Sequence, residues 1–174
     1  VRSRGLGDVY KRQGVICINA AFGEFPGLAG VMFPIFAKII AVVPFSSDVL
    51  AGLSKNKKRT EKLIDNTGSK ITQDSLNHYK VLFSKPSHVK GTLKLMAEWS
   101  LFEFLKNLKN CNSSINFLVG NLDKTVPISV SKKWSQILPR NKYHEISGAG
   151  HLVHEEKPYE VSQIILNHLQ GIKK

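Results

Sequence analysis

The sequence predicts an α/β fold in which a mostly parallel, incomplete sheet is interrupted by a long helical insertion. Two apolar runs, GVICINAA at 14–21 and INFLVGN at 115–121, have the pattern of strands that are buried on both faces. From residue 113 onward, strand-like and helix-like segments alternate, which is typical of a parallel sheet covered by helices. The segment between the two runs is mostly helical in pattern, so it is interpreted as an insertion between two strands.

The insertion begins with an apolar stretch at 20–45 that Pro and Gly residues interrupt, and Pro34 suits the first turn of a helix over 33–43. The basic run KNKKRTEK at 55–62 is interpreted as a solvated loop. Three more helices are predicted by their spacing of apolar residues and their start signals, at 71–84 with Thr72 as the N-terminal cap, at 87–99 and at 100–110.

After the second strand, the pattern predicts a helix over 127–138, a third strand over 142–147 and an amphipathic closing helix over 155–172. We therefore divide the chain into a core strand at 14–22, a helical cap region at 23–100 and the C-terminal part of the core at 101–174. Residues 1–13, VRSRGLGDVYKRQ, lack the apolar segment of a signal peptide. They resemble the translation of a sequencing adapter from a metagenomic fragment, and we expect a non-native tail and a gene truncated before Gly14.

Composition restricts the classes of partner. The chain has 174 residues, of which 42% are hydrophobic, and a formal net charge of +12. No aromatic interleaving or nucleic-acid-binding motif accompanies the charge, so no nucleic-acid partner is expected. Cys17 and Cys111 form no CxxC motif, which favours a reducing compartment and a cytoplasmic protein. The broken apolar stretch argues against a membrane span, while peripheral contact with an anionic membrane stays open.

Two loops carry the candidate chemistry. Asp123 follows the second strand in VGNLDKTVP, and His151 follows the third in SGAGHLVHEEKP. In open α/β sheets, reactive residues lie on loops at the carboxyl ends of the strands, so neighbouring parallel strands would bring these two loops together. A carboxylate beside an imidazole fixes its tautomer and stabilises the imidazolium that forms during proton transfer.

These loops resemble those of the α/β-hydrolase family. GNLDKTVP is similar to its G-x-x-D-x-x-V-P acid loop, and GHLVHEEKP to its G-H-x-x-x-x-E-x-P histidine loop. The resemblance implies the C-terminal part of an α/β-hydrolase fold, with His151 as the general base and Asp123 as its partner in a catalytic triad. Glu155 and Glu156 are expected to match the charge at the N-terminus of the last helix, and His154 to lie at the surface.

A nucleophile is missing. The sequence contains no G-x-S-x-G, and Ser69 and Ser147 lack the strand–turn–helix setting of a nucleophile elbow. In the family, the elbow precedes the strand placed here at 14–21, so this chain alone is expected to be inactive. Asn19, at the end of that strand, is interpreted as a packing or turn residue. No His or Cys has partners at metal-ligand spacing, so neither a metal nor another cofactor is expected.

The insertion and the acid loop also resemble the magnesium chelatase accessory proteins of bacteriochlorophyll biosynthesis, through NTGSKITQDSLNHYKVLF, SHVKGTLKLMAEW and FLVGNLDKTVP. The resemblance implies a small hydrophobic substrate or a tetrapyrrole, and chelatase subunits as partners. The candidate substrate-binding residues are the aromatic residues of the cap, Phe25, Phe33, Phe36 and Trp99. Two alternatives stay open: a non-catalytic porphyrin-binding accessory protein, and a general carboxylesterase, peptidase or epoxide-hydrolase relative.

Overall fold

The computed structural model describes residues 14–23, 38, 40, 42–98, 100–111 and 113–172. The chain forms two compact units. The sheet unit takes the residues up to Phe22, the short segment Thr67–Ser69 and the residues from Phe104 onward. The helical unit takes Gly23–Asn66 and Lys70–Glu103. The polypeptide therefore enters the sheet unit for three residues between two helices of the helical unit.

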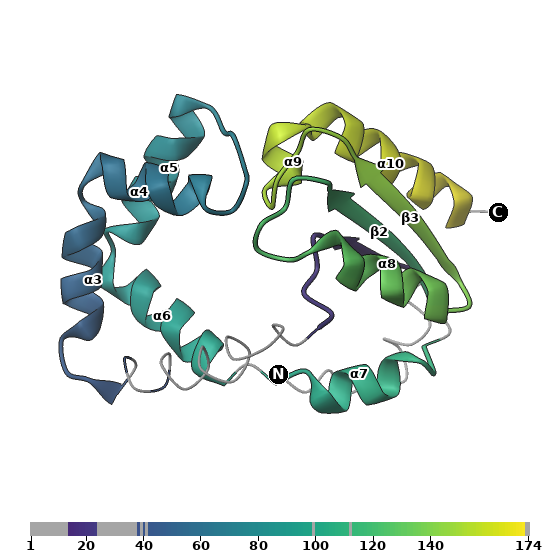
Figure 1. Ribbon diagram of the computed structural model, residues 1–174, viewed down its shortest axis with the longest axis horizontal. Helices are drawn as coiled ribbons and strands as arrows, with labels where there is room; N and C mark the ends of the chain where they lie inside the picture. Colours follow the sequence, from purple (N-terminus) through teal and green to yellow (C-terminus); the bar gives the residue numbers. More distant parts are fainter. Residues whose placement is uncertain are drawn as a thin grey trace. The chain divides into compact units, whose positions relative to one another are not determined.

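A three-stranded parallel sheet is the centre of the sheet unit (Figure 1). Its strands are β1 (Gly14–Ile18), β2 (Ser114–Gly120) and β3 (Asn141–Ile146), in the order β1-β2-β3. The three strands predicted from the sequence are all present. Because all strands run in one direction, Gly120 pairs with Ile146, and β2 and β3 end side by side.

Helices cover both faces of this sheet (Figure 1). Phe117 of β2 packs on one face with Leu108 of α7 (Phe102–Leu108) and Trp134 of α8 (Ile128–Ile137). Leu118 packs on the opposite face with Val153 of α9 (Val153–Glu156) and with α10 (Pro158–Ile172). The side chains of β2 are buried on both faces, as its continuous apolar pattern predicts.

The closing helix differs from its prediction. The pattern predicts one helix over 155–172, whereas the structure has the short α9 followed by α10, with Lys157 between them. Pro158 lacks a backbone N–H, so it suits the first turn of a new helix better than the interior of a continuous one. Glu155 and Glu156 therefore belong to α9, and their predicted place at the start of the last helix is wrong.

The helical unit contains α3 (Ser46–Ser54), α4 (Lys57–Asp65), α5 (Gln73–Phe83) and α6 (Pro86–Ala97). The interpretation of 55–62 as a loop is wrong, because α4 occupies most of it. Asn56 caps this helix by accepting a hydrogen bond from Lys58 N, and Thr60 and Ile64, one turn apart, are its buried residues. The lysines and Arg59 lie on the exposed remainder of the helix.

Three of the other predicted helices are present, and a fourth lies mostly outside the described residues. The helix predicted over 71–84 is α5, and Thr72 caps it by accepting a hydrogen bond from Ser75 N at 3.2 Å. Those predicted over 87–99 and 100–110 correspond to α6 and α7. The helix predicted over 33–43 falls mostly outside the described residues. Among the described residues, no helix is long and apolar enough to cross a membrane.

Candidate active site

Asp123 lies in the turn that follows β2, and its carboxylate organises this turn. Oδ1 accepts hydrogen bonds from the backbone amides of Thr125 at 2.7 Å and Val126 at 2.9 Å. These amides lie just before α8 and would otherwise lack partners in a buried setting. The side chain of Asp123 is fully buried. The local fold therefore holds the carboxylate in place and leaves its second oxygen, Oδ2, for another donor.

His151 lies in the turn that follows β3, and its imidazole faces that second oxygen. Nδ1 of His151 is 2.9 Å from Oδ2 of Asp123. A carboxylate accepts hydrogen bonds but does not donate them, so the contact favours the tautomer that carries its proton on Nδ1. The side chain of His151 is 29% exposed, so Nε2 is the ring nitrogen available to a reacting group. This is the arrangement of a general base and the acid that orients it.

The two residues are 28 positions apart, and parallel pairing brings them together. The turns after β2 and β3 also hold each other directly. Leu122 N donates to Ala149 O at 2.8 Å, and Gly148 N donates to Oδ1 of Asn121 at 2.8 Å. The contact between the imidazole and the carboxylate is therefore built into two adjoining turns of the sheet unit.

Comparison with known proteins places this arrangement in a known fold. No family model matches the sequence. Over 157 residues, the chain is 36% identical to the magnesium-chelatase 30 kDa subunit of Rhodobacter capsulatus, covering 90% of this chain and 55% of that protein. The chain thus spans about half the length of this curated relative.

Solved structures agree on the architecture. An esterase from Thermogutta terrifontis superposes with a TM-score of 0.65 at 17% identity, over 93% of this chain and 57% of the esterase. An alpha/beta hydrolase fold protein from Burkholderia ambifaria gives 0.64 at 14% identity, over 89% of this chain and 56% of that chain. MenH from S. aureus superposes with a TM-score of 0.64 at 16% identity, over 93% of this chain and 60% of MenH. The chain has the α/β-hydrolase fold.

Within the α/β-hydrolase fold, acid and histidine follow the strands in the order predicted from the sequence. The predicted fold class is confirmed by these structural matches. The resemblance to magnesium chelatase accessory proteins is confirmed by the relative from Rhodobacter capsulatus. The structural likenesses, all below 25% identity, carry the fold and not the reaction.

Ser69 and Ser147 lie on loops near the pair formed by Asp123 and His151, and their settings differ. Ser69 is 1% exposed, and its Oγ accepts a hydrogen bond from Leu152 N at 2.8 Å. Ser147 is exposed in the turn after β3. The imidazole of His151 contacts the carboxylate of Asp123. Among the described residues, neither Ser69 nor Ser147 hydrogen-bonds to the imidazole of His151.

Three residues have roles that the sequence reasoning missed. Asn19 was interpreted as a packing or turn residue, and Ser69 as lacking the setting of a nucleophile elbow. Both hydrogen-bond to the backbone around His151. Glu156, expected at a helix N-terminus, accepts a hydrogen bond from Gly150 N at 2.8 Å. The available signal was the placement of Asn19 directly after a buried strand, where a polar residue needs a partner.

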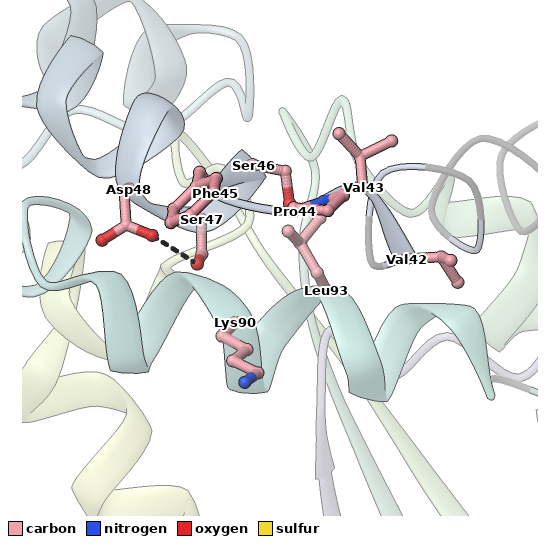
Figure 2. Close-up of a pocket in the computed structure, with 9 residues that line it drawn as sticks. All are labelled: Val42, Val43, Pro44, Phe45, Ser46, Ser47, Asp48, Lys90 and Leu93. Carbon is pink, nitrogen blue, oxygen red and sulfur yellow. Dashed lines mark hydrogen bonds between the residues drawn. The ribbon is translucent and has the colours of Figure 1, made fainter.

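The aromatic candidates for substrate contact, Phe25, Phe33, Phe36 and Trp99, lie outside the described residues. The described part of the helical unit contains a pocket of about 260 Å³ between the turn before α3 and one side of α6 (Figure 2). Figure 2 shows Phe45 in that turn and Lys90 and Leu93 on α6. Within the described ranges, no group of three or more His, Cys, Asp or Glu residues is arranged to hold a metal ion.

Proposed function

We propose that this chain works as part of a longer protein, here called the full-length protein, in which Asp123 and His151 complete a hydrolase triad. The observation that supports the proposal is the 2.9 Å contact between Nδ1 of His151 and Oδ2 of Asp123. The other oxygen of Asp123 is held by two backbone amides, so the carboxylate cannot turn away from the imidazole. Such preorganisation is the main requirement of a general base and its partner.

In the proposed reaction, Nε2 of His151 takes the proton of a nucleophilic hydroxyl as that oxygen attacks an ester-like carbonyl. Asp123 stays ionised and stabilises the imidazolium. His151 then returns the proton to the leaving alcohol, which leaves the acyl group on the nucleophile. In the second step His151 takes a proton from the water that attacks this acyl group and returns it to the nucleophile, so that the carboxylic acid is released. The nucleophile and the amides of the oxyanion hole belong to residues upstream of this chain, and the substrate is a small hydrophobic ester or an esterified tetrapyrrole.

The similarity to a magnesium-chelatase subunit supports a place at the magnesium-insertion step, with chelatase subunits as partners. The helical unit would then work as the cap that meets the substrate. Cys17 and Cys111 are both free thiols, which supports a cytoplasmic location. Peripheral contact with a membrane remains part of the proposal, supported by the exposed basic residues of α4.

The experiment compares ester hydrolysis by the full-length protein and its variants, using p-nitrophenyl esters of increasing acyl length. His151→Gln should lower kcat by about 10⁶-fold because the general base is lost, and Asp123→Asn by about 10⁴-fold because the wrong tautomer forms. His154→Gln is the matched control, since His154 is exposed and pairs only at 3.8 Å with Glu155. A kcat of His151→Gln equal to that of His154→Gln, or a wild-type protein without turnover, would contradict the proposal.

A second candidate function is a non-catalytic accessory protein that binds porphyrin, and the chelatase relative favours it. Titration with protoporphyrin should then quench porphyrin fluorescence at micromolar protein. The residue at the nucleophile position upstream separates the candidates. Ser supports the esterase, Asp supports a dehalogenase or epoxide hydrolase, and Gly or Ala supports the binding protein.

A further inference from the structure

Hydrogen bonds from distant parts of the chain hold the backbone around His151 at successive carbonyl and amide groups. Asn19 provides two of these bonds. Its Nδ2 donates to Gly150 O at 2.9 Å and to His151 O at 2.6 Å. Its Oδ1 accepts from Gly120 N at 2.8 Å, at the end of β2. One amide side chain thus joins the strand that leads to Asp123 to the loop that carries His151.

The burial and backbone conformation of Asn19 fix the orientation of its side chain. The residue follows β1 directly, is 3% exposed and has φ of 43°, a left-handed conformation that Asn tolerates better than most residues. Its own backbone N–H donates to Leu118 O at 2.9 Å, which continues the pairing of β1 with β2. The side-chain amide can lie in only one orientation, because the reverse would point its oxygen at two carbonyl oxygens.

The short segment Thr67–Ser69 holds the same loop from the amide side. His151 N donates to Thr67 O at 3.3 Å, and Leu152 N donates to Oγ of Ser69 at 2.8 Å. The backbone of this segment lies close to that of the loop that carries His151, since a Cβ added to Gly150 would lie 2.3–2.5 Å from backbone atoms of Gly68 and Ser69. Thr67 O also accepts from Lys124 N at 3.1 Å, next to Asp123.

We infer that Asn19 and Ser69 are positioning residues for His151: they hold its backbone so that Nδ1 stays bonded to Asp123 and Nε2 keeps its direction. The inference rests on the proposed function for its catalytic consequence, but not for its structural one. Neither side chain bonds to the imidazole, so each acts through the loop and not on a substrate. A displacement of about 1 Å at such a site can lower a rate by about 100-fold.

The test uses Asn19→Asp in the full-length protein. This change keeps the shape of the side chain, removes the donor and places an acceptor against Gly150 O and His151 O. Asn116→Asp is the matched control, because Asn116 is 1% exposed in the neighbouring strand β2 and does not reach His151. Both changes put a carboxyl group into the core, so both should lower the melting temperature.

The decisive readout is the nitrogen NMR spectrum of the His151 ring, recorded with its Nδ1–H proton signal. Asn19→Asp should abolish the hydrogen-bonded Nδ1–H signal and mix the two tautomers, whereas Asn116→Asp should keep both features. If the wild-type protein turns over esters, kcat should fall about 100-fold in Asn19→Asp with KM within about twofold. The same spectrum in Asn19→Asp and Asn116→Asp would overturn the inference.

Ser69→Ala keeps the inference falsifiable if Asn19→Asp does not fold, since it removes a single oxygen. The amide hydrogen of Leu152 should then exchange at least about tenfold faster, and the Nδ1–H signal should weaken. An unchanged His151 spectrum in folded Ser69→Ala, with unchanged exchange at Leu152, would refute the role of this segment. A wild-type protein without turnover contradicts the proposed function alone, because the ring spectrum still decides the positioning role.

Discussion

Asp123 uses its two carboxylate oxygens for different tasks. One oxygen caps the turn before α8, and the other bonds to His151. The pair Asp123–His151 could be predicted from sequence, because each residue follows a strand in a recognisable loop. The partners of Asn19 and Ser69 could not, since they are backbone atoms 131 and 83 residues away. The position of Asn19 directly after a buried strand indicates only that its side chain needs a partner.

Gly68 gives a prediction at the residue scale. Its φ is +82°, and an added Cβ would lie 2.0 Å from the backbone oxygen of Leu122. Gly68→Ala should therefore lower the free energy of unfolding of the full-length protein by at least about 2 kcal/mol. Gly91→Ala is the control, since nothing lies within 4 Å of its Cβ position in α6, and it should stabilise by up to about 1 kcal/mol. Urea denaturation measures both, and equal midpoints would refute the prediction.

The two cysteines should differ in reactivity. Burial, with a smaller effect from Cys111, raises the pKa of the Cys17 thiol to about 11. The thiolate is the reactive form, so at pH 8 Cys17 should be alkylated far more slowly than the partly exposed Cys111. Iodoacetamide labelling followed by peptide mass spectrometry measures the two rates. Equal labelling in the native protein would contradict this, and labelling in urea provides the control in which both should react.

At the scale of elements, the strands were the most predictable part of the fold. The continuous apolar runs of β1 and β2 match a parallel sheet with helices on both faces, and β3 was predicted from its place in the alternation of strands and helices. Helix α4 was not predicted because its sequence is rich in basic residues and shows almost no apolar periodicity. Its buried residues are Thr60 and Ile64, of which only Ile64 is apolar. Its start signal is also weak in sequence, since Asn56 lies within the basic run. The break between α9 and α10 occurs just before Pro158. It was not predicted because the prediction of a single helix relied on the spacing of apolar residues alone.

Helix α5 allows the importance of its cap to be measured. Oγ1 of Thr72 accepts from Ser75 N, and this bond satisfies one of the free amides at the helix N-terminus. Thr72→Ala should lower the free energy of unfolding of the full-length protein by about 1 kcal/mol. Thr72→Ser keeps the hydroxyl group and should stay within a few tenths of that of the wild type. Chemical denaturation of the three proteins decides, and equal stability of Thr72→Ala and Thr72→Ser would refute a capping role.

At the scale of the whole molecule, the sheet unit presents strand edges. In the described part of the chain, β1 pairs with β2 alone, so its other edge is open. The side chain of Val15 on that strand is 39% exposed. An open edge that carries apolar side chains is a template for pairing between molecules. The 174-residue chain without upstream residues should therefore aggregate, unfold without cooperativity and lack esterase turnover.

The last prediction separates edge pairing from a general lack of stability. Val15→Lys puts a charge beside the open edge, at a position exposed enough to keep a lysine in water. It should reduce light scattering by the 174-residue chain on warming. The contact between Asp123 and His151 should stay unchanged, because both residues lie beyond the carboxyl ends of the strands, whereas Val15 lies near the start of β1. Leu166→Lys is the control, since Leu166 is also an exposed apolar residue, 50% exposed, but belongs to helix α10 and not to a strand. If both lysines suppress aggregation equally, net charge and not the edge is responsible, because repulsion between like-charged molecules needs no particular site.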